Sequence, residues 1–328
     1  MPKAAYVYPN IPRSLMGSGN PYIEHLKTAL GSAGLLVDPL SYENAFADFV
    51  RNAWRAHLVV LNWMEDVPSK RSGLLQMAIL VPYLAGLRLL GKRVVWIRHN
   101  RAPHQTERRG IKRAFSGYLG FVASRIVCHS RDALSGSKSV FRYHPSAATV
   151  VDEVSPGETD LLIWGSIAPY KGIREFLEYA SGDARLSGLR IHVVGRCADP
   201  AYWEDLQRLK GPGMVLVNAF ATPEELVRLF ERSRCILFTY KRDSVSSSGV
   251  LIDSLAACRP IIGPDYGAFR DLARDTGFVY AYQNFNDIAT LLNAAGPHYV
   301  LDRAKVQTFL AENSWHAFGV ALAGPLGS

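Results

Sequence analysis

Short apolar runs alternate with longer amphipathic stretches along most of this 328-residue chain. The runs are continuous in hydrophobic residues instead of strictly alternating, which is typical of parallel strands covered on both faces. The runs predicted to be strands are Ala4–Tyr8, Leu58–Leu61, Val94–Ile97, Ile126–Cys128, Leu161–Trp164, Ile191–Val194, Met214–Val217, Cys235–Phe238, Pro260–Ile262 and Phe278–Tyr280.

Helix-forming segments fill the intervals between these runs. The clearest start signal is Thr222-Pro223-Glu224-Glu225, because threonine can cap a helix, proline suits its first turn and acids suit its positive end. The other predicted helices are Tyr22–Ala33, Glu43–Trp54, Ser72–Leu90, Glu107–Leu119, Ile173–Ala180 and Gly249–Ala257. Strands that alternate with helices indicate repeated βαβ units, so we predict an α/β fold with doubly wound sheets.

A change of composition near the middle of the chain indicates two domains. Residues 146–160 contain proline, glycine and the acids Asp152, Glu153 and Glu158, and each side carries its own series of strands and helices. We therefore expect one domain over residues 1–150 and a second over 151–305. In the remaining segment, 306–328, a helix containing Trp315 is expected to pack back on the first domain, and the final five residues resemble an expression-tag remnant.

The charge balance favours an anionic partner without selecting one. The chain has 37 Lys and Arg against 29 Asp and Glu, a net charge of +8. Nucleic acid, an anionic membrane, a phosphate-rich substrate and a merely solvated basic surface all fit this value. The four cysteines are far apart and form no Cys-x-x-Cys pair, which predicts free thiols in a reducing cytoplasm and no metal site.

The N-terminus lacks the pattern of a signal peptide, and one long apolar stretch requires an interpretation. Leu74–Leu90 is short for a membrane span and is interrupted by Gln76, Pro82 and Arg88. We therefore expect a buried helix at this position.

The segment from Ser246 to Asp253 follows a predicted strand and opens a predicted helix. The free backbone N–H groups and positive dipole end of such a helix can hold a diphosphate. Ser247 and Ser248 can cap it, and Gly249 permits close approach of the backbone. Asp253, about one turn later, could reach the hydroxyls of a ribose. An ordinary serine-capped helix would explain the segment equally well.

The residues that follow resemble glycosyltransferase family 4, the group 1 enzymes of the GT-B fold and related bacterial exopolysaccharide glycosyltransferases. From Gly249 to Pro260 the order is glycine, apolar residues, an acid, an alanine-rich stretch, a basic residue and proline before a strand, as in that family. Asp265–Leu272 extends the similarity, and Gly165–Gly172 matches the family segment that ends in Lys-Gly. The resemblance implies two Rossmann-like domains facing a cleft, with the acceptor on the first and the nucleotide sugar on the second.

The resemblance also implies roles for single residues. Lys171 would contact the donor phosphates and act in catalysis, since a lysine offers a point charge to a leaving diphosphate. On its own, a lysine in a turn with proline and glycine would be structural. The residues implied to bind the nucleotide sugar are Gly165, Ser166, Lys171, Arg196, Phe220, Ser247, Ser248, Gly249 and Asp253. Ser166 and Val245 depart from the pattern, because the family often has arginine at the first position and an acid at the second.

In the first half, His99-Asn100 and Pro103-His104 follow a predicted strand. Open α/β sheets bind ligands at the carboxyl ends of their strands, and many relatives carry this His-Asn and Pro-His spacing. His99 is therefore the catalytic candidate, with Asn100 and His104 beside it, and a structural role for both histidines is the alternative. Glu65 and Asp66 are further candidates for a general base.

The loop between the first strand and the first helix contains Gly17, Gly19 and Asn20, which the resemblance places at the cleft. Glycines there let the backbone approach a ligand. The Gly-x-Gly is not a complete dinucleotide fingerprint, because Tyr22 stands where a third glycine would be. A nicotinamide dehydrogenase is therefore disfavoured.

A basic run with interleaved aromatic residues lies between residues 101 and 118. As a helix it would be basic and amphipathic, like a membrane-surface element, although a solvated basic face fits as well. Its members are Arg101, Arg108, Arg109, Lys112 and Arg113, with Phe115 and Tyr118. No nucleic-acid motif accompanies the run, so nucleic acid is not an expected partner.

These observations predict an enzyme of polysaccharide biosynthesis that moves a hexose from a UDP- or GDP-sugar to a hydroxyl of a lipid-linked saccharide or polysaccharide. The resemblance implies no metal or other cofactor, and the location expected is the cytoplasm or the inner face of an anionic membrane. A catalytically weak sugar-nucleotide-binding module is the alternative, motivated by Ser166 and Val245. A nucleic-acid or membrane-binding scaffold rests on charge alone.

Overall fold

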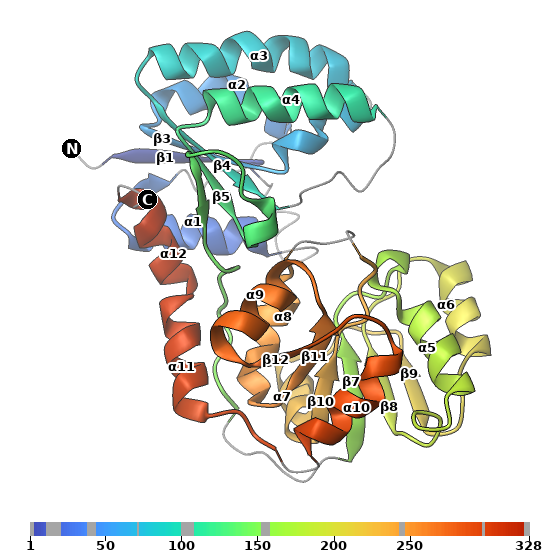
Figure 1. Cartoon of the computed structure of the whole chain (residues 1–328). Helices are drawn as coiled ribbons and strands as arrows, with labels where there is room; N and C mark the ends of the chain where they lie inside the picture. The colour runs from blue at the N-terminus through green and yellow to red at the C-terminus, as the bar shows by residue number, and fades with distance from the viewer. Residues whose placement is uncertain are drawn as a thin grey trace. The chain divides into compact units, whose positions relative to one another are not determined.

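The structure is a computed structural model that describes residues 3–10, 21–37, 44–70, 72–99, 108–151, 158–242, 247–296 and 299–324. The chain forms two compact units, unit 1 from residues 1–145 and 313–328 and unit 2 from residues 146–312. Each unit contains a six-stranded sheet whose strands are parallel, with helices on both faces (Figure 1). The predicted α/β class with doubly wound sheets is confirmed.

Unit 1 has the strand order β2-β1-β3-β4-β5-β6. Its strands are β1 (Ala4–Tyr8), β2 (Leu36–Val37), β3 (Leu58–Asn62), β4 (Arg93–Arg98), β5 (Arg125–Cys128) and β6 (Ser139–Phe141). Its helices are α1 (Tyr22–Ser32), α2 (Ala45–Asn52), α3 (Gly73–Leu89), α4 (Arg109–Val122) and α12 (Trp315–Ala323). The four strands predicted for the first half are confirmed.

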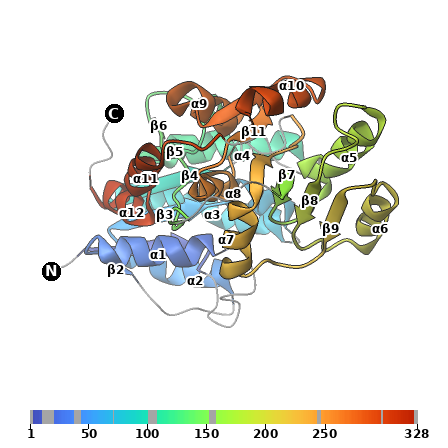
Figure 2. The same cartoon turned by 90° about the horizontal axis from the view of Figure 1, so that it is seen from below.

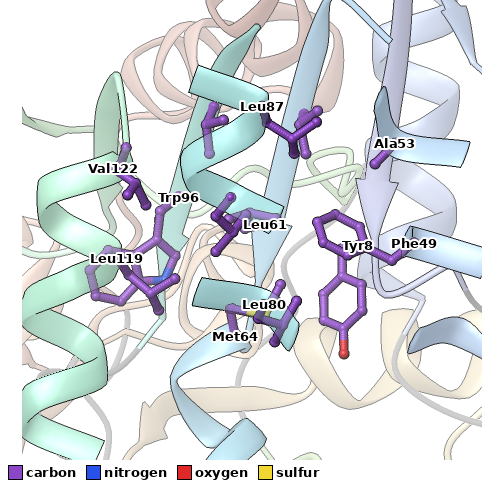
Figure 3. Close-up of a cluster of buried hydrophobic side chains, with 14 of the residues drawn as sticks. Tyr8, Phe49, Ala53, Leu61, Met64, Leu80, Leu87, Trp96, Leu119 and Val122 are labelled. Atoms are coloured by element: carbon purple, nitrogen blue, oxygen red, sulfur yellow. The ribbon is translucent and has the colours of Figure 1, made fainter. Parts of the chain in front are cut away.

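Two hydrophobic cores lie on the two faces of the unit 1 sheet. Alternate residues of a strand point to opposite faces, so Tyr6 and Tyr8 enter the core under α2, α3 and α4, while Ala5 and Val7 enter the core under α1 and α12. Figure 3 shows the first of these cores. A Cβ on Gly319 would lie 2.4 Å from the Ala29 carbonyl oxygen, so glycine lets α12 pack closely on α1.

Unit 2 has the strand order β12-β11-β10-β7-β8-β9 (Figure 1), and the labelled strands β11, β7, β8 and β9 follow this order in Figure 2. Its strands are β7 (Thr159–Trp164), β8 (Ile191–Val194), β9 (Met214–Val217), β10 (Ser233–Leu237), β11 (Ile261–Pro264) and β12 (Val279–Tyr282). Its helices are α5 (Ile173–Gly182), α6 (Pro200–Arg208), α7 (Pro223–Glu231), α8 (Gly249–Asp253), α9 (Gly267–Thr276), α10 (Asn286–Ala295) and α11 (Arg303–Glu312). All six strands predicted for the second half are confirmed.

Two features of the helices refine the sequence-based picture. The predicted start of α7 is a full capping box, in which Thr222 Oγ1 accepts from the Glu225 N–H and the Glu225 carboxylate accepts from the Thr222 N–H. The segment 306–328 does not form the single helix that was expected. It contains most of α11, which belongs to unit 2, and all of α12, which belongs to unit 1.

The expectation of a buried helix at 74–90 is wrong for one side of α3. Leu80, Leu84 and Leu87 are fully buried, but Leu75 is 66% and Leu89 is 89% exposed. The sequence cannot show this, because a helix that is apolar on all sides has no periodic pattern to mark its outer face. None of the described helices has the length and apolar content needed to cross a membrane.

Candidate active site

The strand order of unit 2 reverses between β7 and β10. The chain leaves β7 through Gly165 and the 3₁₀ turn Pro169–Lys171, and leaves β10 toward α8. Loops that diverge from such a reversal open a crevice at the carboxyl ends of the strands, which is where α/β sheets bind ligands. The predicted diphosphate segment and the predicted lysine therefore flank one switch point.

Backbone contacts fix the turn that carries Lys171. Gly172 has φ +68°, and a Cβ there would lie 2.3 Å from the Thr239 carbonyl oxygen, so only glycine fits against the end of β10. The Thr239 hydroxyl donates a hydrogen bond of 2.6 Å to the Lys171 carbonyl oxygen. The turn after β7 is thus held on the residues that follow β10.

The Lys171 ammonium reaches back under the end of β7. A Cβ on Gly165, which has φ +93°, would lie 3.3 Å from Lys171 Nζ and 3.3 Å from the Val250 methyl groups in α8. A Cβ on Gly195, after β8, would lie 1.8 Å from the Gly165 carbonyl oxygen. The glycines therefore bring backbone and ammonium together at the start of α8.

Lys171 is a buried cation. It is 3% exposed, and its Nζ lies 5.4 Å from the centre of the Tyr240 ring. Burial lowers the pKa of Lys171 to about 8. No carboxylate of the described residues pairs with this ammonium. Isolated charges inside proteins are costly unless paired, so the site is built to receive an anion.

The start of α8 adds two serine hydroxyls to the site. Ser248 precedes the helix in an extended conformation, and its side chain makes no capping hydrogen bond. Its hydroxyl oxygen lies 3.2 Å from the hydroxyl oxygen of Tyr240, the ring that also contacts Lys171. Ser247 Oγ is buried and has no hydrogen-bond partner among the described residues. Buried hydroxyls are normally paired, so these groups are complementary to ligand oxygens.

Asp253 closes α8 and is held by a residue that the sequence did not single out. The Ser146 hydroxyl donates a 2.5 Å hydrogen bond to Asp253 Oδ1. Burial raises the pKa of the Asp253 carboxyl to about 6, and the Ser146 hydrogen bond opposes this shift. The carboxyl therefore lies one helical turn from Gly249, as predicted, in a largely desolvated place.

The remaining donor candidates lie at the ends of β7, β8 and β9. Ser166 and Arg196 are exposed, and Phe220 is 74% exposed. Asn218 Oδ1 accepts a 2.8 Å hydrogen bond from the Cys197 N–H, which ties two of these loops together. The structure places the candidates on the same edge as Lys171 but leaves their side chains in solvent. Val245 lies outside the described residues.

In unit 1, His99 follows β4 and contacts the end of β3. Asn62 Nδ2 donates a 3.0 Å hydrogen bond to the Tyr8 carbonyl oxygen, which turns Asn62 Oδ1 toward His99 Nε2 at 3.2 Å. His99 Nε2 is then the protonated nitrogen, and Nδ1 carries the lone pair. Burial and two nearby histidines hold the pKa of His99 well below its usual value, so the ring is neutral at pH 7.

His99 belongs to an aromatic cluster at the carboxyl ends of the unit 1 strands. Its ring stacks on Trp63 with a centroid separation of 4.6 Å. His129 follows β5 and lies 5.6 Å from His99 between ring centres, and His144 lies 5.2 Å from His129. Burial lowers the pKa of His129 to about 4 and that of His144 to about 3. The two added histidines follow strands, as His99 does, but no motif marks them.

The other unit 1 candidates have separate surroundings. Glu65 is buried and accepts a 3.1 Å hydrogen bond from Trp96 Nε1, and burial raises its pKa to about 7. Asp66 lies 3.8 Å from the buried Lys112 ammonium, so this part of the basic run faces inward. The candidates that fall outside the described residues are Gly17, Gly19, Asn20, Asn100, Arg101 and His104.

Comparison with known proteins agrees with this geometry. Residues 158–295, which include the sites around Lys171 and Asp253, match the family model of group 1 glycosyl transferases. A relative from Xanthomonas campestris pv. campestris, named GDP-mannose:glycolipid 4-beta-D-mannosyltransferase, is 27% identical over 285 residues, 83% of this chain and 78% of that protein.

Solved structures extend the similarity to both units. Anabaena Alr3699/HepE, solved with UDP and glucose, superposes with a TM-score of 0.63 at 11% identity and 98% coverage of both chains. Sucrose-phosphate synthase from Thermosynechococcus elongatus gives a TM-score of 0.65 at 16% identity, again with 98% coverage of both chains. The chain therefore has the GT-B fold of these glycosyltransferase structures. The switch point of unit 2 lies within the part of the chain that matches the family model.

Proposed function

We propose that this protein is a glycosyltransferase that moves a hexose from a nucleoside diphosphate sugar to a hydroxyl of a lipid-linked saccharide at the inner face of a membrane. The carrying observation is the buried Lys171 ammonium, which pairs with no carboxylate of the described residues and lies at the start of α8. GDP-mannose and a glycolipid are the first pair to test, since the relative from Xanthomonas is named for them.

Lys171 would stabilise the leaving group. In the reaction the acceptor oxygen bonds to the anomeric carbon, the bond from that carbon to the β-phosphate oxygen breaks, and the acceptor proton passes to a base. Negative charge develops on the diphosphate as the bond breaks, and a fixed cation in a water-poor site is most effective against such charge. The Ser247 and Ser248 hydroxyls and the first N–H groups of α8 supply hydrogen bonds to the same oxygens.

Asp253 would bind the ribose. A carboxylate can accept hydrogen bonds from two neighbouring hydroxyls, and Asp253 lies one turn from the proposed diphosphate position. The Ser146 hydrogen bond orients the carboxyl for this role. When the ribose binds, its two hydroxyls donate hydrogen bonds to the Asp253 carboxylate. These hydrogen bonds offset the cost of burial and favour the ionised form of the carboxyl.

His99 is the base that we assign to the acceptor in unit 1. Its ring is neutral at pH 7, and the Asn62 contact leaves Nδ1 as the basic nitrogen. A neutral imidazole fixed by a hydrogen bond is suited to take the acceptor proton. We further propose that transfer needs no metal ion, because Lys171 and the α8 start supply the positive field.

A donor screen tests this function. The protein is incubated with labelled UDP- and GDP-sugars in the presence of lipid acceptors, and labelled lipid and free nucleoside diphosphate are measured. We expect saturable transfer from one donor. Saturable binding without transfer to any acceptor would favour the sugar-nucleotide-binding module instead.

A further inference from the structure

Helix α3 exposes an apolar face along its whole length. At about 100° per residue, the outer residues fall within one arc of roughly 160°. They are Leu74, Leu75, Ala78, Ile79, Val81, Pro82 and Leu89, and most of them are exposed large hydrophobics. The arc contains no charged or hydrogen-bonding side chain. We call this surface the α3 face.

The inner side of α3 is equally apolar. Leu80 and Leu87 point into the core toward Leu61 of β3 (Figure 3). A helix that is apolar on all sides is expected inside a protein core or in lipid, whereas α3 lies on the outside of unit 1 (Figure 1). Its 17 residues are fewer than the ~20 needed to span a bilayer. A helix lying along an interface satisfies both observations.

An apolar groove continues the α3 face toward α2. The groove has a volume of 580 Å³ and is lined by Ile79, Pro82 and Leu90 together with Trp54. Trp54 is 48% exposed, and the Arg55 guanidinium lies 5.3 Å from the centre of its ring. Tryptophan and arginine together are typical of the boundary between lipid headgroups and acyl chains.

The segment that contains α3 and α4 carries an excess of positive charge. Residues 67–131 contain thirteen Lys and Arg and a single acid, Glu107, a net charge of +12. The rest of the chain has twenty-four basic and twenty-eight acidic residues, a net charge of −4, so this segment more than accounts for the overall +8. On the neighbouring α4, Arg109 and Arg113 are exposed. The helix next to the α3 face thus carries exposed cations.

Helix α4 is fixed beside α3 by two hydrogen bonds. The Tyr118 hydroxyl donates a hydrogen bond to the Val81 carbonyl oxygen in the middle of α3. Arg108 Nη1 donates a 2.8 Å hydrogen bond to the Pro68 carbonyl oxygen just before α3. The first turn of α4 therefore lies beside the first turn of α3.

We propose that the α3 face and the first turns of α4 form a docking surface for an anionic lipid bilayer. Leu75 and Leu89 enter the acyl region, and Arg109 and Arg113 bind headgroup phosphates. A second copy of the chain is disfavoured, because two surfaces of the same charge would meet. The inference rests on the proposed function in one respect, since a lipid-linked acceptor resides in such a layer.

Vesicle flotation tests the docking surface. The protein is mixed with vesicles of equal parts phosphatidylglycerol and phosphatidylcholine, and with vesicles of phosphatidylcholine alone. We expect binding to the anionic vesicles that weakens with salt. Leu75→Glu with Leu89→Glu should weaken partitioning by about 100-fold or more, because each leucine buried in the acyl layer contributes roughly a factor of ten.

Matched variants separate the parts of the surface. Val227→Glu changes a 40% exposed apolar residue on α7 of unit 2 and should bind vesicles like the wild type. Arg109→Ala with Arg113→Ala should lose preference for anionic vesicles and reduce the salt dependence. Thermal unfolding of each variant with and without GDP or UDP verifies that the fold and unit 2 are intact.

The outcomes distinguish this inference from the proposed function. Nucleotide binding without vesicle binding, or equal flotation of the Leu75→Glu/Leu89→Glu variant and the wild type, overturns the docking surface alone. A wild-type dimer that the double variant converts to a monomer in sedimentation velocity, with no vesicle binding, assigns the face to a second copy and also overturns it. Vesicle binding without any nucleotide binding supports the docking surface and overturns the proposed function.

Discussion

Replacing Lys171 with methionine removes a buried cation and keeps a long flexible side chain. Burial lowers the pKa of Lys171 from 10.5 to about 8 in the free protein. One pKa unit corresponds to about 1.4 kcal/mol, so the protonated amine costs the folded state about 3 kcal/mol. Because the folded pKa lies below the unfolded one, the cost is fully present below pH 8 and disappears as the pH rises through 10.5.

Lys171→Met is therefore expected to raise the free energy of unfolding at pH 7 by up to about 3 kcal/mol, and to have little effect above pH 10.5. The same change removes the cation that receives the diphosphate. Wild-type protein should gain about 2.7 kcal/mol from GDP or UDP at one hundred times the dissociation constant, and the variant should gain almost nothing. We therefore expect Lys171→Met to be more stable than the wild type at pH 7 and to have lost its affinity for GDP and UDP.

Urea unfolding at pH 7 and above pH 10.5, with and without the nucleotide, measures both effects. Lys241→Met is the control, because Lys241 is 45% exposed and pairs with Glu175 at 2.6 Å. The loss of the Lys241 ammonium should change neither the free energy of unfolding nor the stabilisation by nucleotide by more than about 1 kcal/mol. Destabilisation by Lys171→Met at pH 7, or an undiminished gain from nucleotide, would refute the assignment of this lysine as an anion site.

Three further variants test other parts of the account. Asp253→Asn should weaken the affinity for GDP or UDP by at least about tenfold while leaving pyrophosphate affinity unchanged in competition binding, since only the ribose contact is lost. The same variant should also remove the fall in stability that occurs as the pH rises toward the Asp253 pKa of about 6. His99→Gln should lower kcat by about 100-fold or more without changing nucleotide affinity, and a smaller loss would point to another base. Gly195→Ala should cost more than about 2 kcal/mol of stability in urea unfolding, because its Cβ would lie 1.8 Å from the Gly165 carbonyl oxygen. Gly31→Ala, which meets nothing within 4 Å in α1, should be neutral or stabilising and serves as its control.

The strands were readable from the sequence because each buried parallel strand is an uninterrupted apolar run. The ten predicted runs are all strands, and only β2 and β6 were missed. These two edge strands have two and three residues, so they arise from pairing with β1 and β5 and have no pattern of their own. Helix α3 shows a different limit of sequence-based prediction. Its composition predicts an apolar helix, but only the packing in the structure shows which side of the helix is exposed.

The candidate site was readable in part. The resemblance selected Lys171 and Asp253, and the structure places Lys171 beside the start of α8 and Asp253 at its end. The absence of a counter-ion for Lys171 among the described residues, and the Ser146 contact of Asp253, depend on segments far apart in the chain. The sequence could not supply either, and it gave no reason to add His129 or His144 to His99.

Transfer by wild-type protein and by Lys171→Met is the most direct test of the central claim. Both proteins are incubated with labelled GDP-mannose, then with other GDP- and UDP-sugars, and with vesicles that contain lipid-linked saccharides. The account predicts labelled lipid and an equal amount of released nucleoside diphosphate from one donor with the wild type, and at least about 100-fold less with Lys171→Met. Undiminished transfer by Lys171→Met, or no binding of any donor to the wild type at millimolar concentration, would contradict it.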